Sequence, residues 1–410
     1  MWQLIHQTKK SDLSLLEKAR TGVKALKART DLGFLQLAER EELWSSSETR
    51  AREIRRNSLK LVVLGMGGSS LGGRAILQAL QNFSSTHELI FVDNVDSDRF
   101  WKWLKSEADF SSYHWLIISK SGNTIETLTM AESVDQHLRL GGHKRLATQC
   151  TVISETDDNP LMRWAKKESV PTLEIPKDVG GRFSVLSPVG LLPAAFYNVD
   201  LEQMREGSRW ALKQDELIAE LTAQTLMSWK REEWITLFWA YSDGLKEFGL
   251  WIQQLWAESL GKAKDRKGAK APDASTPIAA VGSSDQHSIL QQVIEGRRDK
   301  FLWFFRVEEA ETSGPKLEKN LFDCQALMLN KNMGDLFGAM ATATRDALAE
   351  NSVQSLTLQT KVLDAHAVGA LFMLFELVVG ALGETMNIDA FNQPGVEHGK
   401  IIARKILSRG

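Results

Sequence analysis

The sequence is poor in cysteine and has no signal-type apolar run at its start. Its two cysteines, Cys150 and Cys324, lie far apart and in no metal-like spacing. They predict free buried thiols in a reducing compartment rather than a disulfide framework. The N-terminal stretch is polar throughout, and the longest apolar stretch, about 367–382, is interrupted by Glu376. We therefore expect a soluble, cytoplasmic protein that does not bind a membrane.

An excess of one charge is also missing. The chain has 50 Lys and Arg, 52 Asp and Glu, and a formal net charge of -2. No general field attracts nucleic acid, so an anionic ligand needs a local site. No group of His, Cys or carboxylates has metal-ligand spacing, and no glycine–serine elbow indicates acyl transfer. We expect no metal, cofactor or nucleic-acid partner.

Alternating β-rich and helical segments predict an α/β protein of two stacked domains. The length of 410 residues suits two domains, and 43% hydrophobic residues are typical of a globular protein. Residues 1–57 are predicted to be helical, because apolar positions recur there at helical spacing. Residues 58–200 are predicted to form a first domain of βαβ units on a parallel sheet, and 201–410 linker helices with a second domain. The predicted strands are KLVVLG, ELIFVDN, HWLIIS, QCTVIS, TLEI, WITLFWAY, PIAAVG and KFLWFFRV.

The first predicted strand runs into a glycine-rich turn, GMGGSSLGG, at residues 65–73. Glycines at a strand-to-helix turn let backbone amides approach an anion. Arg74 follows the last glycine where a Walker loop needs Lys, which excludes that loop. A dinucleotide fingerprint has its first two glycines in place and Asp93 at the end of the next strand, but Ser70 stands at the third glycine position. Dinucleotide binding and a ligand-free turn both remain open.

Hydroxyl-bearing side chains crowd the loop ISKSGNTIET before a predicted helix. Ser119, Ser121, Asn123 and Thr124 suit a phosphate monoester, whose oxygens accept several hydrogen bonds. Alternatively, Asn123 or Thr124 caps the helix, with Glu126 reaching back in a capping box. One cap does not need four polar side chains, so the pattern favours phosphate.

An arginine and an acid are candidates for the chemistry. Arg182 follows two glycines in GGRFSVLSPVGLLP, where it either stabilises an oxyanion or forms a surface ion pair. Helical spacing places Glu258 on one face with Trp251, Gln254 and Leu255. An acid in apolar surroundings is suited to act as a general base. An ion pair with the lysine four residues later is the ordinary alternative.

Two further polar residues follow later in the chain. His287, in AVGSSDQHSILQQ, is placed for proton transfer near neutral pH, although Ser284 or Asp285 there could be simple caps. Lys400 lies about two turns into a short helix in FNQPGVEHGKIIARK, where it contacts a ligand or pairs with Glu397. Together with the loops, these residues favour acid–base chemistry on a phosphorylated metabolite.

At these residues the sequence resembles the phosphoglucose isomerase family. The resemblance implies two sugar-isomerase-type α/β/α sandwich domains with parallel sheets in a flavodoxin-like layout, and a homodimer. It also implies conversion of glucose 6-phosphate to fructose 6-phosphate through a cis-enediol in glycolysis and gluconeogenesis, with no cofactor. The matching blocks, in the family's order, are GMGGSSLG, SKSGNTIET, GGRFSVLSPVGLLP, WIQQLWAESLGK, GSSDQHSILQQ and QPGVEHGK.

The resemblance also implies roles for individual residues. Arg182 would stabilise the enediolate and Glu258 would move the proton between carbons 1 and 2. His287, from the neighbouring subunit, and Lys400 would assist opening of the sugar ring. The implied substrate-binding residues are Gly68, Ser69, Ser119, Lys120, Ser121, Thr124, Gln254 and Gln393.

The hydroxyl-rich loop departs from the family's common form. It reads SKSGNT where many members have SKTFTT. Glycine–asparagine–threonine forms resemble the bifunctional glucose/mannose phosphate isomerases, so mannose 6-phosphate is an alternative substrate. A phosphosugar-sensing protein without catalysis would not need the acid, the histidine and the lysine together.

Overall fold

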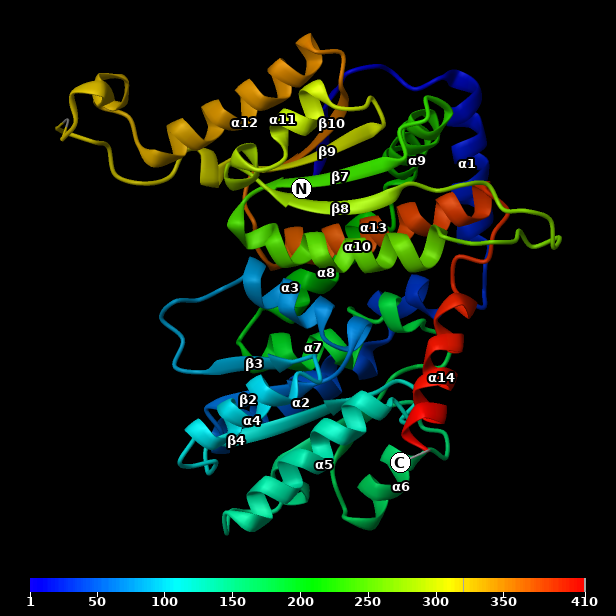
Figure 1. Cartoon of the computed structure of the whole chain (residues 1–410), viewed down its shortest axis with the longest axis vertical. Coiled ribbons are helices and arrows are strands. Elements are labelled where there is room, and N and C mark those ends of the chain that lie inside the picture. The colour runs from blue at the N-terminus through cyan, green and yellow to red at the C-terminus, as the bar shows by residue number, and fades with distance from the viewer. Residues whose placement is uncertain (320, 409–410) are drawn as a thin grey trace.

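A computed structural model describes residues 1–319 and 321–408 and shows two α/β domains stacked along the long axis (Figure 1). The first contains a five-stranded sheet in the order β3-β2-β4-β5-β6, with every neighbouring pair parallel. Renumbered within the domain, this is the flavodoxin order 2-1-3-4-5. Its elements are β2 (Lys60–Leu64), α3 (Leu71–Ala79), β3 (Glu88–Val92), α4 (Ser97–Ser106), β4 (Tyr113–Ile118), α5 (Ile125–Leu140), β5 (Cys150–Ser154), α6 (Pro160–Lys167), β6 (Thr172–Glu174) and α7 (Pro188–Phe196), preceded by α2 (Glu41–Asn57).

Alternating side chains attach helices to both faces of this sheet. Val62 and Leu64 of β2 pack in one cluster with residues of α4, α5 and α6, whereas Leu61 and Val63 pack in another with α2, α3 and α7. This period of two is what a strand buried on both faces produces. The buried free thiol of Cys150 belongs to the first cluster, as expected, while the side chain of Cys324 lies outside the described residues.

The second domain has the strand order β1-β10-β9-β7-β8, parallel except for β1. Helices α11 and α12 cover one face, and α10 and α13 the other. Its elements are β1 (Gln3–Gln7), α1 (Leu13–Lys27), α8 (Leu201–Ala211), α9 (Asp215–Lys230), β7 (Ile235–Tyr241), α10 (Lys246–Leu260), β8 (Thr276–Val281), α11 (Leu290–Glu295), β9 (Lys300–Val307), α12 (Met333–Glu350), β10 (Gln354–Thr360), α13 (Ala365–Thr385) and α14 (Glu397–Leu407).

The eight β-rich runs predicted from the sequence are all strands, but β1 and β10 were not among them. The expectation that residues 1–57 are helical is wrong at the start, because β1 pairs antiparallel with β10 (Leu4 opposite Leu358). The partner is far away in the sequence, so no local pattern indicates the pairing. In β10, QSLTLQT, polar residues such as Thr357 are buried, so the strand lacks the apolar run used to recognise the others.

The apolar segment around Glu376 is the long helix α13. By length and composition alone this helix, with a mean hydropathy of 1.9, could cross a membrane. The sequence predicts otherwise, because Glu376 interrupts the apolar stretch. Its window is 89% buried inside the protein, the condition of a core helix. Glu376 is fully buried, neither carboxylate oxygen has a hydrogen-bond partner among the described residues, and burial raises its pKa well above the usual value. Burial therefore favours the protonated form of Glu376.

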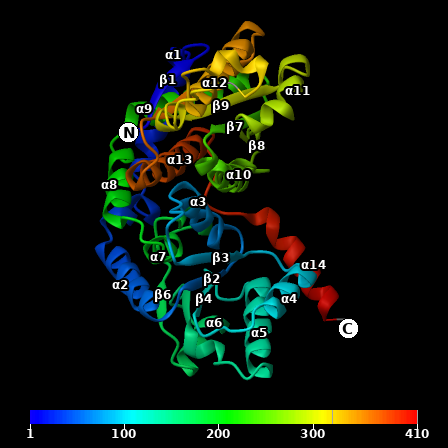
Figure 2. The same cartoon turned by 90° about the vertical axis from the view of Figure 1, so that its left-hand side faces the viewer.

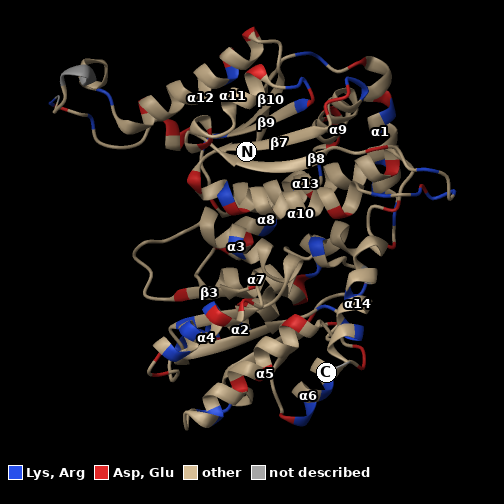
Figure 3. Ribbon diagram, in the orientation of Figure 1, with Lys and Arg blue, Asp and Glu red and all other residues tan. Residues whose placement is uncertain are grey.

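The domains meet where α10 of the second packs on α3 of the first. After α13 the chain returns to the first domain, and α14 extends along one side of it (Figure 1 and Figure 2). Lys, Arg, Asp and Glu are interspersed over both domains in the part of the chain that the structure describes (Figure 3). The arrangement brings α10 and the C-terminal segment to the carboxyl edge of the first sheet.

Candidate active site

A cavity of about 710 Å³ opens between the first domain, α10 and the C-terminal segment. It lies beyond the carboxyl ends of β2 and β4, beside the switch point of the first sheet, where open α/β sheets bind ligands. Every predicted site residue except Ser119 and His287 lines it. The lining residues are Met66, Gly67, Gly68, Ser69, Lys120, Ser121, Asn123, Thr124, Glu126, Glu155, Gly180, Gly181, Arg182, Gln254, Glu258, Phe391, Gln393, Val396, Lys400, Ile401 and Arg404.

The glycine-rich turn forms one wall through its backbone. Gly67 has a left-handed φ of +54°, which glycine adopts without strain. A Cβ on Gly68 would lie 2.4 Å from the carbonyl oxygen of Gly181, so only glycine lets this turn approach the loop that holds Arg182. The short 3₁₀ turn Gly67–Ser69 then leads into α3.

The dinucleotide interpretation of this turn needs Asp93 to bind a ribose, but the carboxylate of Asp93 already has other partners. Asp93 accepts a hydrogen bond from Ser70 Oγ at 3.1 Å and forms an ion pair with Arg74 at 2.8 Å. Arg74 also bonds Glu247 of α10 at 2.8 Å. The carboxylate of Asp93 is thus engaged within the first domain, and Arg74 links it to the second.

The hydroxyl-rich loop does not form the capping box that the sequence left open. Thr124 is the N-cap residue of α5, but no side-chain cap hydrogen bond is formed among the described residues. Instead Ser119 Oγ donates to Thr124 Oγ1 at 2.9 Å, and Ser121 Oγ donates to Asn123 Oδ1 at 2.7 Å. Ser119 is buried beneath the loop and orients Thr124, which faces the cavity. The N-terminus of α5 is left to meet an anion.

The backbone conformation and the close packing of the hydroxyl-rich loop explain why it contains a glycine. Gly122 has a φ of +61°, and a Cβ there would lie 1.8 Å from Asn159 Oδ1. Asn159 in turn accepts from Met162 N at 2.9 Å and caps α6. The glycine in SKSGNT therefore has a packing reason that does not depend on the substrate.

Charged side chains surround the loop. Lys120 pairs with Glu155 at 3.2 Å, and both line the cavity together with Glu126 and Arg404. Sequence reasoning did not assign Glu155 or Arg404 to the site. Glu155 directly follows β5, and Arg404 is one helical turn beyond Lys400, so strand-end and helix-face rules could have found both.

Arg182 is a buried residue, which removes the alternative of a surface ion pair. It is 3% exposed, and its guanidinium is held on every side. Nε donates to Ser259 Oγ at 2.7 Å, and Nη2 donates to the carbonyls of Ala390 at 2.6 Å and Asn392 at 3.1 Å. Nη1 donates to Gln393 Oε1 at 2.8 Å. Burial lowers the pKa of Arg182, but an arginine remains charged.

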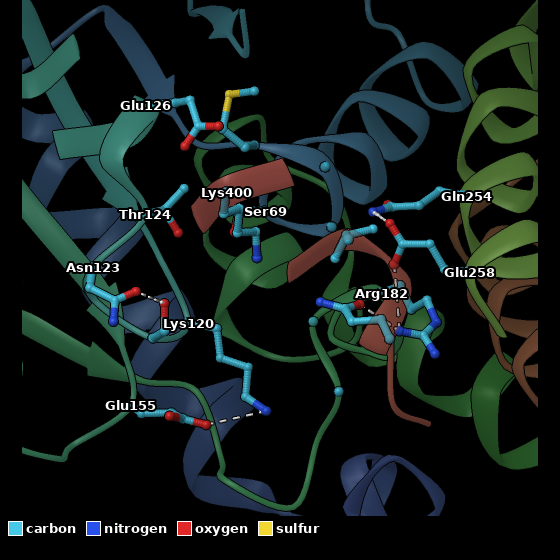
Figure 4. A pocket seen from close by; sticks show the side chains of 18 of the residues that line it. Ser69, Lys120, Asn123, Thr124, Glu126, Glu155, Arg182, Gln254, Glu258 and Lys400 are labelled. Atoms are coloured by element: carbon cyan, nitrogen blue, oxygen red, sulfur yellow. Dashed lines mark hydrogen bonds and ion pairs between the residues drawn. The ribbon is translucent and has the colours of Figure 1, made fainter. Parts of the chain in front are cut away.

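Glu258 meets this guanidinium at the cavity wall. One carboxylate oxygen accepts from Gln254 Nε2 at 3.1 Å and the other lies 3.5 Å from Arg182 Nη1. Trp251 and Leu255 are buried behind it. The alternative pairing with Lys262 is not formed, because Lys262 Nζ donates to the backbone carbonyl of Glu258 at 2.7 Å. Figure 4 shows Gln254, Glu258 and Arg182 together, across the cavity from Asn123 and Thr124.

Gln393 and Lys400 come from the C-terminal segment. The 3₁₀ turn Pro394–Val396 leads into α14, as the sequence predicts, and Lys400 of this helix lines the cavity beside Ser69 (Figure 4). The alternative of a Lys400–Glu397 pair involves a side chain outside the described ones.

His287 is the predicted catalytic residue that the described part of this cavity lacks. It ends the 3₁₀ turn Ser284–His287 after β8 and is exposed. Asp285 holds this turn by accepting from Val281 N at 2.7 Å and from Ser288 Oγ at 2.7 Å. Gln286 anchors it by donating to Tyr241 Oη at 2.7 Å. The turn is thus fixed, with His287 directed away from the domain's core.

Comparisons with known proteins identify the relatives of this chain. The model of the family described as phosphoglucose isomerase matches residues 47–409. A glucose-6-phosphate isomerase of Thermus thermophilus is 33% identical over 401 residues, covering 96% of this chain and 95% of its own.

Solved structures share the fold. A hypothetical protein from Thermus thermophilus superposes with a TM-score of 0.87 at 32% identity, covering 96% of this chain and 95% of that one. A glucose-6-phosphate isomerase from Chlamydia trachomatis superposes with a TM-score of 0.84 at 21% identity, covering 99% and 88%. The expected pair of sugar-isomerase-type α/β domains is confirmed, and the chain belongs to the phosphoglucose isomerase family.

Proposed function

We propose that this chain interconverts glucose 6-phosphate and fructose 6-phosphate, the aldose–ketose isomerisation of its family in glycolysis and gluconeogenesis. One observation supports this most: the carboxylate of Glu258 faces the cavity between an amide and a buried guanidinium, opposite a hydroxyl-rich helix N-terminus. An acid that moves a proton, a cation that stabilises charge and an anion-binding loop are what this reaction needs.

The phosphate group belongs at the N-terminus of α5. Ser69, Ser121 and Thr124 line the cavity there, and the open amides of the helix favour an anion. Lys120 adds a positive charge. With the phosphate in this position, the substrate chain extends across the cavity toward α10.

Glu258 takes the proton from carbon 2 of the aldose and returns it to carbon 1. The C–H bond beside a carbonyl is weakly acidic, so the barrier lies in forming the enediolate. Arg182 lies 3.5 Å from the carboxylate, where its charge offsets the negative charge that develops on the substrate oxygen. Gln254 orients the carboxylate from the other side. None of these steps requires a metal or a nicotinamide.

The sugar ring must open before this proton transfer. Lys400 lines the cavity from α14 and is placed to contact a ring oxygen or hydroxyl. His287 is proposed to complete this step from a second copy of the chain, since it is exposed on a fixed turn away from its own cavity.

A homodimer would supply that histidine. The described parts of three regions expose apolar side chains that a partner could cover: Phe322 and Leu327 before α12, Met333 at its start, and Ile401 and Ile406 in α14. Dimers with a twofold axis place the same surface on both subunits, so each would complete the other's site. We also propose that the dimer is cytoplasmic, which cell fractionation tests.

Mixing two inactive variants tests the shared site. Glu258→Gln and His287→Ala are each expected to be inactive alone, while a mixed dimer has one site with both functional groups. Co-expression with two affinity tags and sequential purification should recover activity in the mixed species. If mixed dimers stay inactive, or if light scattering shows a monomer with full activity, the partner-supplied histidine is wrong.

The reaction itself is tested with purified protein, glucose 6-phosphate and a chelator, with no added cofactor. Formation of fructose 6-phosphate supports the proposal, and its absence contradicts it. Assaying mannose 6-phosphate in parallel tests the dual-specificity alternative. The packing reason for Gly122 weakens the sequence argument for that activity, because this glycine is explained without reference to the substrate.

A further inference from the structure

The segment between α13 and α14 brings Gln393 to the site and needs to be held in place. Asp389 fixes its start, accepting from Phe391 N at 3.0 Å and from Asn392 Nδ2 at 2.6 Å. The carbonyl groups of Ala390 and Asn392 both accept from the guanidinium of Arg182, which belongs to the first domain. An unpaired buried carbonyl would be costly, so these contacts decide where Gln393 lies.

Lys262 adds a second cation at this junction. It follows the end of α10, and its Nζ donates at 2.7 Å to the backbone carbonyl of Glu258 and also to the carbonyl of Asn392. The carbonyl of Glu258 is in the last turn of the helix, where cations are favoured and carbonyls lack intrahelical partners. One ammonium therefore joins the turn that carries the base to the segment that carries Gln393.

Arg182 and Lys262 share the Asn392 carbonyl. Arg182 donates to it at 3.1 Å and at the same time donates to Gln393 Oε1. Moving the segment would therefore shift the partners of the guanidinium as well as Gln393. The half-buried Lys262 therefore connects three groups: the carboxylate of Glu258, the guanidinium of Arg182 and the side chain of Gln393.

We propose that Lys262 is a positioning residue for the isomerisation, which holds Gln393 and the guanidinium of Arg182 in register with the carboxylate of Glu258. This inference rests on the proposed function, because it assigns those three groups to the same reaction. Lys262 itself is not among the lining residues and is not assigned a contact with substrate.

The surroundings of Lys262 make this contact sensitive to pH. Burial, and after it the positive charge of Arg182, lowers the pKa of Lys262 to about 8, against the opposing effect of the Asp389 and Glu258 carboxylates. A neutral amine still donates but loses the charge-assisted part of both bonds. The substrate phosphate is already dianionic there, since its second pKa is about 6. Turnover should therefore fall above about pH 8 as the ammonium is lost.

The test compares Lys262→Met, Lys262→Arg and the wild type in kcat and KM from pH 6.5 to 10. Lys262→Met should lower kcat at pH 7 by about tenfold to a hundredfold, the effect of misplacing reacting groups by about 1 Å, and change KM by less than about threefold. It should also abolish the fall of kcat near pH 8. Lys262→Arg should recover most of the activity and move that fall to higher pH, because arginine keeps its charge.

Two controls separate positioning from general damage. Lys264→Met changes an exposed lysine of the same loop and should match the wild type at every pH. Binding of a non-isomerisable hexitol 6-phosphate to Lys262→Met, measured by calorimetry, should stay within about threefold of the wild type, since the phosphate loop is untouched.

Three results would overturn the inference: wild-type kcat in Lys262→Met, a fall near pH 8 that stays unchanged in that variant, or hexitol phosphate binding lost together with turnover. If the wild-type protein is itself inactive toward glucose 6-phosphate, the proposed function fails first, and the two failures are thereby distinguished.

Discussion

The two domains share the arrangement of four parallel strands but differ in the fifth, which is the parallel β6 in the first and the antiparallel β1 in the second. They also use their switch points differently. In the first, the loops after β2 and β4 end in glycines and hydroxyls that line the cavity. In the second, β7 and β9 are the corresponding strands, and they are followed by acidic residues, Asp243 and Glu308 to Glu311. The second domain contributes instead through the side of α10 and the C-terminal segment. The same arrangement of four strands therefore carries the proposed anion-binding site in one domain and lies beside the proposed catalytic wall in the other.

The two walls also differ in how they are held. Arg182 comes from the first domain but lies against α10 and the C-terminal segment, where it is buried and each of its three guanidinium nitrogens donates a hydrogen bond. Ser121 and Thr124, in contrast, bond only to their own loop among the described contacts. A group that stabilises transition-state charge benefits from being fixed before the reaction. A loop that receives a phosphate forms its bonds with the ligand. The predictions below test this division.

Replacing the base should have the largest effect. Glu258→Gln keeps the shape and the contact with Gln254 but cannot accept the carbon-bound proton, so kcat should fall by about 10³-fold or more. Binding of a hexitol 6-phosphate, measured by calorimetry, should change by less than about threefold. Near-normal turnover would show that the second domain does not supply the base.

Replacing the guanidinium of Arg182 by an amine should have the next largest effect. Arg182→Lys keeps a positive charge but cannot serve Ser259, Gln393 and two carbonyls together. We expect kcat to fall by about 10²- to 10³-fold, as for removal of one charge-stabilising donor, and thermal unfolding to occur at lower temperature. Steady-state kinetics and calorimetry measure both, and an unchanged kcat would show that this fixed geometry is unnecessary.

Removing a hydroxyl from the first domain should act on binding instead. Thr124→Val should raise KM by about tenfold and leave kcat within about threefold, because a phosphate contact is present in ground and transition states alike. The matched control is Glu309→Gln at the second switch point. The side chain is exposed there, so the substitution should change neither kcat nor KM. A loss of kcat with unchanged KM would reverse the assignment of the two walls.

The buried titratable groups of the two domains should give small pH effects of opposite sign. Burial lowers the pKa of His114 in β4 to about 3, so its stabilising contribution is present above pH 6.5 and is lost as pH falls toward 3. Lowering the pH from 7 to 5 should therefore reduce the free energy of unfolding by about 2 kcal/mol through His114. Urea unfolding of the wild type and of His114→Gln at both values should show a weaker dependence in the variant.

Glu376 in α13 should act in the other direction. Its raised pKa favours the protonated native form, so its contribution is present below about pH 4.5 and is lost as pH rises toward the folded-state value. Glu376→Gln should remove this loss. The free energy of unfolding of the variant and of the wild type, measured between pH 5 and 8, tests this. An identical pH dependence in variant and wild type would mean that the carboxyl finds a partner.

Much of the fold could be predicted because the buried strands of both sheets are continuous apolar runs. The missed strands show the limit: β1 is short and its partner is distant, and β10 buries Ser355 and Thr357. A pattern based on apolar residues does not recognise a buried hydroxyl-bearing strand.

The site was predicted residue by residue only through the family's blocks. Helical spacing allowed Glu258 to pair with Lys262, and tertiary packing decided otherwise by drawing that lysine to backbone carbonyls. Burial of Arg182 depends on segments far apart in the chain, which no local pattern contains. His287 is exposed on a turn after β8, and its proposed role depends on a second copy of the chain, which no local pattern predicts.

The pairing of β1 with β10 has a consequence for biosynthesis. Residue 3 is made near the start and residue 359 near the end, so at about 5–20 residues per second the first strand waits roughly 20 to 70 s for its partner. Throughout that time the first domain can fold, while the second cannot close its sheet. Once formed, β1 covers the edge of β10, and unprotected edges recruit other chains. A ribosome-bound or N-terminally trimmed chain would thus be most at risk of aggregating at β10, far from the residues that act on the sugar.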